Sequence, residues 1–148
     1  VKLGRMNHIG VATPDLDASV AFYRDVMGAT DITEPFVLES QQVRVCFVNT
    51  PTHSGMTGTQ VELLQPTSPD SAVGKWLEKN PLGGQHHICY EVPDIHAAKA
   101  WFEGLGKRVL GEPALTRIHS GFFSTSPGAT LIGMRDSLAA AFCLALAS

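Results

Sequence analysis

One stretch of the sequence occurs twice: residues 8–16 read HIGVATPDL, and residues 87–95 read HICYEVPDI. An offset of 79 residues, which places His8 on His87, gives six identities over positions 8–23. Self-similarity of this kind indicates one supersecondary unit that is used twice. Each copy begins with the alternating pattern of a strand, is interrupted by Pro-Asp, and continues as an amphipathic helix. The sequence therefore predicts an α+β fold built from two tandem β-α-β-β-β modules.

The limits of the helices follow from capping residues. Asp15 and Asp94 are expected N-caps, and Gly28 and Gly106 are expected to end the two helices. The apolar helix faces are expected to contain Leu16, Val20, Tyr23 and Met27 in the first copy, and Ile95, Ala98, Trp101, Phe102 and Leu105 in the second.

Strand-like runs follow each helix and outline the modules. They lie at residues 43–48 and 60–64 after the first helix, and at 108–110, 121–124 and 130–134 after the second. The expected modules are residues 5–66 and 85–136 of a single domain, 1–148. Residues 67–84 are expected to connect them through a short helix capped by Asp70 or Ser71, and residues 137–148 to form an apolar tail.

Composition excludes several classes of protein. The 148 residues suit one compact domain, and a net charge of -3 without a long basic run argues against nucleic-acid binding. The apolar run at residues 138–147 is too short for a bilayer, which needs about 20 residues. Three widely spaced cysteines favour reduced thiols over a disulfide framework.

The alternation of strand side chains places three polar residues on one face. Ile9 and Val11 are expected to face the first helix, which leaves His8 on the open side of the sheet. The same alternation places His87 and Glu91 on the open side of the second copy, and Glu62 beside His8.

Two imidazoles and a carboxylate can hold a divalent cation. A single strand histidine is more often a packed polar residue than a ligand, but two histidines at equivalent positions of a repeat favour ligands. We therefore expect His8, Glu62 and His87 to bind metal. The remaining histidines are expected to be structural, on the helix side (His86), or to lie in loops or on the surface (His53, His96, His119).

Four segments carry a family resemblance: NHIGVA at 7–12, VELLQP at 61–66, DSAVGKWLEKN at 70–80 and GQHHIC at 84–89. Residues 5–113 resemble the methylmalonyl-CoA epimerase family of the vicinal oxygen chelate (glyoxalase/bleomycin resistance/dioxygenase) superfamily. The resemblance implies a cupped mixed sheet made of two modules. It also implies an isomerase of propionate metabolism, in a bacterial cytoplasm or a mitochondrial matrix, that is commonly a homodimer.

The resemblance further implies one divalent ion, such as cobalt, zinc, manganese or nickel, on His8, Glu62 and His87. The ion would chelate the carboxylate and thioester oxygens of methylmalonyl-CoA and stabilise the enolate formed when the C2 proton leaves. Reprotonation on the other face would interconvert the 2R and 2S epimers. Lys75, Lys79 and Arg117 are candidate charges for the acyl-CoA substrate.

The sequence departs from the family in its last part. Gly133 stands where family members carry a fourth ligand, a glutamate, and by the internal repeat it also corresponds to Glu62. Val45 stands where some bacterial members carry an acid. Glu91, on the His87 face, is the expected replacement acid.

Other readings stay open at this point. The chain could be a glyoxalase-like isomerase, a dioxygenase, or an acyl-CoA or small-molecule binding domain without catalysis. Its apolar tail could pack on the domain, pack against a second subunit, or fray.

Overall fold

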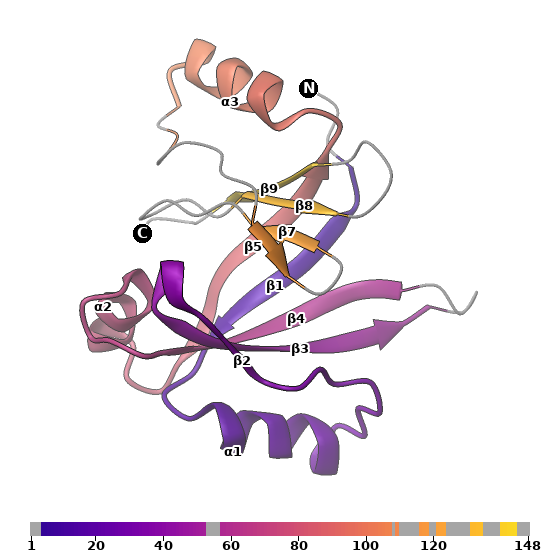
Figure 1. Cartoon of the computed structure of the whole chain (residues 1–148), viewed down its shortest axis with the longest axis vertical. Coiled ribbons are helices and arrows are strands. Elements are labelled where there is room, and N and C mark those ends of the chain that lie inside the picture. The colour runs from indigo at the N-terminus through magenta and orange to yellow at the C-terminus, as the bar shows by residue number, and fades with distance from the viewer. Residues whose placement is uncertain are drawn as a thin grey trace. The chain divides into compact units, whose positions relative to one another are not determined.

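The computed structural model describes residues 4–52, 57–107, 109, 116–118, 121–123, 131–134 and 140–144 (Figure 1). The chain divides into two compact units, one of residues His8–His86 and one of Val1–Asn7 with His87–Ser148. Strands β1 (Met6–Ala12) and β5 (Gly84–Val92) each continue from one unit into the other. We refer to the first as the His8–His86 unit and to the second as the His87–Ser148 unit.

The His8–His86 unit has the predicted β-α-β-β-β order. Its strands β2 (Phe36–Leu38), β3 (Val43–Pro51) and β4 (Thr57–Pro66) join β1 in the order β2-β3-β4-β1. The β2–β3 and β3–β4 pairings are antiparallel, whereas β4 pairs with β1 in parallel. A short 3-10 helix, Glu39–Gln41, links β2 to β3. The parallel pairing brings the first and last strands of the module side by side.

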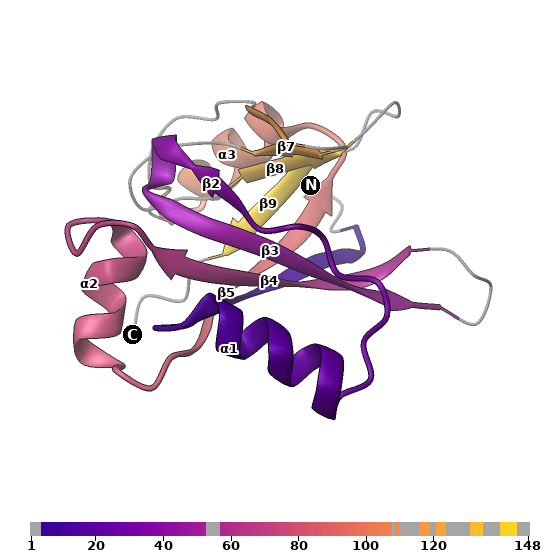
Figure 2. The ribbon, with the colours of Figure 1, turned by 60° about the horizontal axis from the view of Figure 1, so that its bottom comes forward.

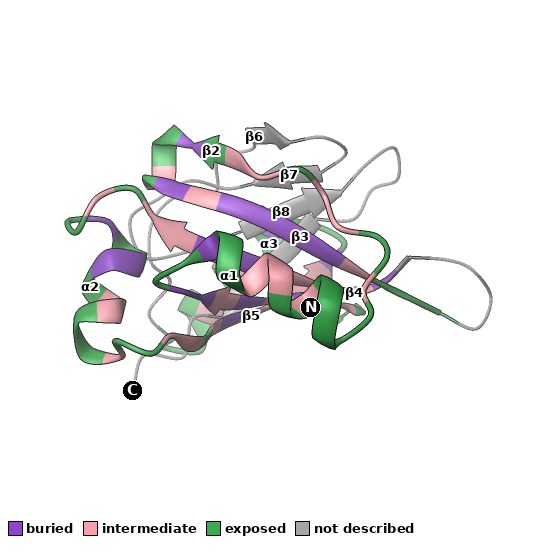
Figure 3. Cartoon of the chain, turned by 90° about the horizontal axis from the view of Figure 1, so that it is seen from below, coloured by how far each residue is buried: buried purple, intermediate pink, exposed green. Residues whose placement is uncertain are grey.

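Helix α1 (Leu16–Ala21) covers one face of this sheet (Figure 2). The side chain of Asp15 caps it by accepting a hydrogen bond from the backbone N–H of Ala18 at 3.0 Å, as predicted. The core under the helix consists of the buried residues Leu16, Cys46, Val48 and Leu63, packed with Val11, Val20, Tyr23, Ala29, Ile32 and Val61. Figure 3 shows the largely buried strand β3 behind helix α1, whose outer side is exposed.

The expected position of Met27 in this core is wrong, because its side chain is 64% exposed. A π-helical turn, Phe22–Val26, follows α1, and the backbone N–H of Met27 bonds to the carbonyl of Phe22, five residues earlier. This wider turn shifts the helical periodicity, so the face that buries Leu16 no longer includes Met27. Gly28 then ends the helix at a φ of 71°, as predicted.

Helix α2 (Ala72–Lys79) is the predicted connecting helix. Of the two expected caps, Ser71 is the one used, since its Oγ accepts a hydrogen bond from the backbone N–H of Gly74 at 2.9 Å. Ser71 is buried.

The His87–Ser148 unit contains helix α3 and a sheet to which β5 contributes. Helix α3 (Ile95–Gly104) is capped by Asp94, which accepts from the backbone N–H of Ala97 at 2.9 Å, and Gly106 adopts a φ of 70° after it. Ile95 and Ala98 are buried with Val92, and Phe102 packs on them. Trp101 and Leu105 are 53% and 58% exposed, so the expected burial of both is wrong, and Phe102 takes the place on the core that Trp101 or Phe102 was expected to fill. Leu105 follows the last helical residue and is therefore outside the regular face.

All strand pairings described within this sheet are antiparallel, in the order β5-β9-β8-β7-β6. Its further strands are β6 (Thr116–Ile118), β7 (Gly121–Phe123), β8 (Leu131–Met134) and β9 (Ala140–Leu144). Strands β7 and β8 confirm the predictions at 121–124 and 130–134, whereas β6 was not predicted. The strand expected at 108–110 lies largely outside the described residues.

The tail contains strand β9, so its description as a frayed end is wrong for Ala140–Leu144. This strand lies between β5 and β8, and it pairs Cys89 with Cys143 and Gly133 with Ala140. A short continuous apolar run is a pattern that strands share with buried helices, and this run was the signal for a strand that the sequence offered.

Candidate metal site

The parallel pairing of β1 and β4 places His8 and Glu62 on one face of the sheet. In this register His8 is opposite Gln60 and Gly10 is opposite Glu62. Residues of the alternate parity, Val11, Val61 and Leu63, pack toward α1. The predicted alternation is therefore confirmed, and it follows from the period of two that a strand imposes on its side chains.

His8 and Glu62 form a buried polar pair. The His8 Nε2 atom lies 3.4 Å from Oε2 of Glu62, and the two side chains are 0% and 3% exposed. A carboxylate at this depth is costly unless a positive charge compensates it. A cation shared by the imidazole and the carboxylate would provide that charge, so the donor set fits a divalent metal.

His87 completes the predicted group. It directly follows His86 in β5, and like His8 and Glu62 it is buried. Each of the three residues offers one ligand atom, and these atoms lie within 4.8 Å of one another. The group formed by His8, Glu62 and His87 could therefore hold a metal ion.

His86 points to the other side of β5, as predicted for consecutive strand residues. Its ring packs against Trp76 of α2, with centroids 5.6 Å apart and planes at 76°. His86 therefore contributes to packing in the His8–His86 unit.

The face that carries His8 and Glu62 also carries apolar side chains on β3 and β4, beside the hydrogen-bonded pair Asn49 and Gln60. Phe47 is the strand partner of Glu62, and Val45 is the partner of Leu64. Phe47, Val45 and Leu64 are all buried. The Phe47 ring contacts the His8 ring edge-on, with centroids 6.4 Å apart. Such surroundings exclude water and strengthen electrostatic interactions near the polar pair.

Glu91 lies on the His87 face of β5 but has its own partners. The Arg5 guanidinium is 2.8 Å from Oε1 of Glu91, and the Asn7 amide donates to the same oxygen at 3.1 Å. Glu91 comes four residues after His87 along the strand, which corresponds to about 13 Å of backbone. The sequence did not predict Arg5 and Asn7 as partners of Glu91, because the contacts join two segments that are far apart in the chain.

Gly133 does not have the strand neighbours that the repeat predicted for it. Glu62 lies on the strand next to β1, whereas Gly133 on β8 pairs with Phe122 and Ala140, and β9 separates β8 from β5. The expected equivalence of Gly133 and Glu62 is therefore wrong. Strand β9, from the tail, has the place beside β5 that β4 has beside β1.

The remaining candidate residues are exposed or lie outside the described residues. His96 on α3 is exposed, as predicted, and Lys75 and Lys79 are exposed on α2. His53, His119 and the side chain of Arg117 lie outside the described residues.

The thiol of Cys46 lies on the helix side of the sheet, opposite the metal group. Burial raises the pKa of this thiol, and its Sγ donates a hydrogen bond to the carbonyl of Thr33 at 3.1 Å. A protonated, buried thiol of this kind is a packing residue.

Within the part of the chain that the structure describes, none of the helices combines the length and apolar character needed to cross a bilayer.

Comparison with known proteins agrees with the fold. The family model described as the Glyoxalase/Bleomycin resistance protein/Dioxygenase superfamily matches residues 7–123. The chain is 44% identical over 109 residues to the ethylmalonyl-CoA/methylmalonyl-CoA epimerase of Cereibacter sphaeroides, covering 74% of this chain and 76% of that protein. It is 41% identical over 117 residues to the mitochondrial methylmalonyl-CoA epimerase of Bos taurus, covering 79% of this chain and 63% of that protein.

Solved structures show the same relationship. The methylmalonyl-CoA epimerase of Streptomyces coelicolor, in complex with 2-nitronate-propionyl-CoA, superposes with a TM-score of 0.71 at 37% identity, covering 88% of this chain and 85% of that one. A methylmalonyl-CoA epimerase in complex with methylmalonyl-CoA and NH4+ has a TM-score of 0.70 at 40% identity, covering 83% and 85%. These likenesses confirm the predicted vicinal oxygen chelate fold. The chain therefore belongs to the Glyoxalase/Bleomycin resistance protein/Dioxygenase superfamily and, within it, to the methylmalonyl-CoA epimerase family.

Proposed function

We propose that this protein is a metal-dependent epimerase that interconverts the 2R and 2S forms of methylmalonyl-CoA. The observation that carries the proposal is the buried His8–Glu62 pair, with His87 as the third member of its group. The similarity to proteins named methylmalonyl-CoA epimerase supports the choice of substrate.

In the proposed mechanism, His8, Glu62 and His87 hold one divalent ion. When bound, the ion supplies Lewis-acid stabilisation for negative charge on the thioester oxygen. The apolar residues Val45 and Phe47 exclude water from this side of the sheet. Epimerisation breaks the C2–H bond, leaves its electron pair in the thioester enolate, and forms a new C2–H bond on the opposite face, so no oxidant or reductant is needed.

We propose Glu91 as an acid/base group for this proton transfer. Glu91 shares a strand face with His87. Its contacts with Arg5 and Asn7 both use Oε1, and they hold the whole carboxylate, including Oε2, in one orientation. Since about 13 Å of strand separates the two residues, this role requires C2 to lie on the Glu91 side of His87, within reach of the carboxylate directly or through one water molecule.

Deuterium exchange tests the epimerase proposal. Metal-loaded protein incubated with 2R-methylmalonyl-CoA in deuterium oxide is expected to incorporate deuterium at C2 and to produce the 2S epimer. Chelator-treated protein is the control. Absence of exchange above that control would overturn the proposal, and acyl-CoA binding without exchange would identify a binding domain instead.

The same assay tests Glu91. Glu91→Gln is expected to slow exchange at least ~100-fold, the usual range for loss of an acid/base group. Glu103→Gln, a change to an exposed carboxylate on α3, is the matched control. Unchanged exchange in Glu91→Gln would restrict Glu91 to its ion pair with Arg5.

We further propose cobalt, zinc, manganese or nickel as the bound ion, a homodimer as the assembly, and a bacterial cytoplasm or a mitochondrial matrix as the location. The relatives include a bacterial protein and several named as mitochondrial. Metal analysis of the purified protein and its mass in solution by light scattering test the first two points. Bound ferrous iron with oxygen consumption would instead favour a dioxygenase, which uses a similar two-histidine, one-carboxylate set.

A further inference from the structure

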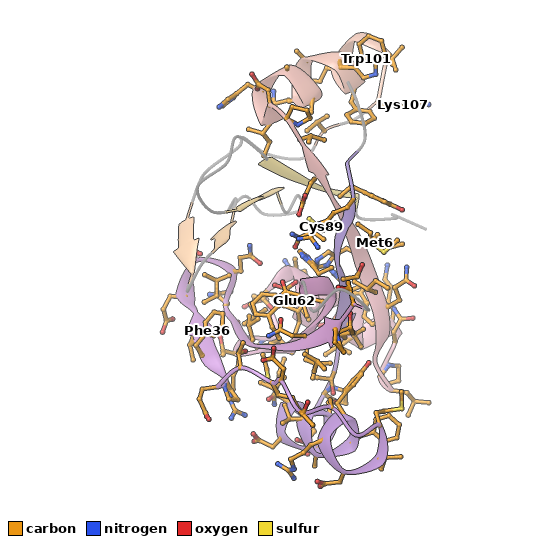
Figure 4. The ribbon with its side chains drawn as sticks, turned by 90° about the vertical axis from the view of Figure 1, so that its right-hand side faces the viewer. Met6, Phe36, Glu62, Cys89, Trp101 and Lys107 are labelled. Atoms are coloured by element: carbon orange, nitrogen blue, oxygen red, sulfur yellow. The ribbon has the colours of Figure 1, made fainter. Side chains whose placement is uncertain are left out.

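The apolar residues around the candidate metal group form a continuous surface on the sheet face of Glu62. Phe47 on β3 is the strand partner of Glu62, and Phe36 on β2 is the partner of Val45. Because paired residues point to the same face, Phe36, Val45 and Phe47 share the side of the sheet that carries His8 and Glu62. We call these three residues the aromatic wall (Figure 4 labels Phe36 and Glu62).

Ring contacts connect the aromatic wall to the candidate ligands. The Phe47 ring lies edge-on to His8 at 6.4 Å between centroids and 73° between planes. Phe36 and Phe47 are stacked, with centroids 6.3 Å apart and planes at 28°. A line of rings therefore runs from His8 to β2, the edge strand of this sheet in the His8–His86 unit.

Burial differs along this line. Val45 is fully buried and Phe47 is 9% exposed, whereas Phe36 is partly exposed. Shortening Phe36 would therefore enlarge the space at the outer end of the wall, while changes at Val45 or Phe47 would affect the packed interior.

We propose that the aromatic wall contacts the alkyl substituent on C2 of the acyl-CoA and limits its size. The proposal rests on the epimerase function proposed above. A group held at His8 and Glu62 from this face shares the face with Phe47. The substituents of C2 in such substrates are a carboxylate, a thioester, hydrogen and an alkyl chain. A wall of three apolar side chains stabilises only the alkyl chain, since a charged carboxylate there would lose its hydration without a polar partner.

The test compares substrates that differ by single methylene groups. Relative kcat/KM values for deuterium exchange are measured with methylmalonyl-, ethylmalonyl- and propylmalonyl-CoA, for the wild type and for Phe36→Ala. The variant is expected to raise the propyl-to-methyl ratio at least ~10-fold, the lower end of the discrimination that a pocket achieves per methylene. Phe22→Ala is the matched control, because Phe22 is 51% exposed in the turn after α1, and its ratio is expected to stay at the wild-type value.

A binding measurement gives a second readout that needs no turnover. Dimethylmalonyl-CoA and methylpropylmalonyl-CoA have no proton on C2, so their dissociation constants report contact alone. Phe36→Ala is expected to improve the affinity for the propyl compound relative to the dimethyl compound, and Phe47→Leu to change the same ratio.

The outcomes separate the two proposals. If the wild type exchanges none of the three substrates, the epimerase function is wrong and the wall proposal falls with it. If the wild type exchanges methylmalonyl-CoA but both ratios of Phe36→Ala stay within about twofold of wild type, well below the effect of one methylene, only the wall proposal is wrong. Circular dichroism checks the fold of each variant, and if Phe47→Leu does not fold, Phe36→Ala alone decides.

Discussion

His8 and Glu62 form a buried polar pair on two neighbouring strands, β1 and β4. Their side chains are almost fully buried, and the closest nitrogen and oxygen atoms are 3.4 Å apart. A buried carboxylate beside an imidazole is stable only with a compensating positive charge, which either a proton or a metal ion can supply. Strand parity predicted from the sequence that the two side chains share one face of the sheet, because successive residues of a strand point to opposite faces.

At this scale we predict that His8→Ala and Glu62→Ala lose metal. Each change removes one donor of the group, so the affinity for zinc or cobalt is expected to fall at least ~10-fold. A loss of this size is the lower end of the effect of mutating residues that only hydrogen-bond to a metal ligand. Metal content after dialysis, measured by plasma mass spectrometry, checks this. His96→Ala, on the exposed side of α3, is the control, and an unchanged metal content in His8→Ala would contradict the assignment.

We also predict that Cys46 resists alkylation in the native protein. Burial raises the pKa of its thiol, so the reactive thiolate is scarce at pH 8, and the hydrogen bond to Thr33 holds the side chain in the core. Mass spectrometry after brief iodoacetamide treatment is expected to find Cys46 modified only after unfolding in guanidinium. Equal modification rates in native and unfolded protein would show that the site is open.

At the scale of elements, capping and strand pairing explain where the helices and strands begin. The Pro-Asp pair recurs, and both aspartates cap a helix as predicted, because an N-cap needs only its own helix. The choice between Asp70 and Ser71 could not be predicted in this way. Both residue types cap well. In the structure the Ser71 hydroxyl donates to the carbonyl of Ser68, and this contact places its oxygen where it accepts from the N–H of Gly74.

The cap of α2 gives a matched pair of variants. Ser71→Ala is expected to lower the free energy of unfolding by about 1 kcal/mol, because the N–H of Gly74 loses its acceptor. Asp70→Ala, one residue earlier, is expected to change it by less than about 0.5 kcal/mol, as for other surface positions. Urea unfolding of both variants measures the difference, and equal effects would contradict the cap assignment.

Strand β9 pairs with β5 on one side and with β8 on the other, so its backbone amides are expected to matter for stability. Ala141 lies opposite both Glu91 on β5 and Ile132 on β8, so the strand has a partner on each side. Ala141→Pro is expected to destabilise the protein by about 1–3 kcal/mol or more through the lost donor and its unpaired partner. Ala141→Ser keeps the amide and serves as the control. If both variants unfold at the same urea concentration, the tail does not form this strand.

At the scale of the whole molecule, metal binding is expected to stabilise the folded chain. Since the group of His8, Glu62 and His87 exists only in the native state, an ion at 100 times its dissociation constant is expected to add about 2.7 kcal/mol. Thermal unfolding is expected to show a higher midpoint with zinc or cobalt than with chelator. The shift is expected to disappear in His8→Ala, and a shift of equal size in that variant would place the ion elsewhere.

The amino-acid sequence was enough to predict the duplication, the helix caps and the face on which His8 and Glu62 lie. These features depend on local periodicity and capping, which neighbouring residues specify. Three features required the folded structure: β9 rather than the strand of Gly133 lies beside β5, Arg5 and Asn7 contact Glu91, and Phe36 and Phe47 stack on the face of the candidate ligands. Strand neighbours are chosen by pairing between segments far apart in the chain, and a repeat in sequence does not require that the same neighbour be chosen twice.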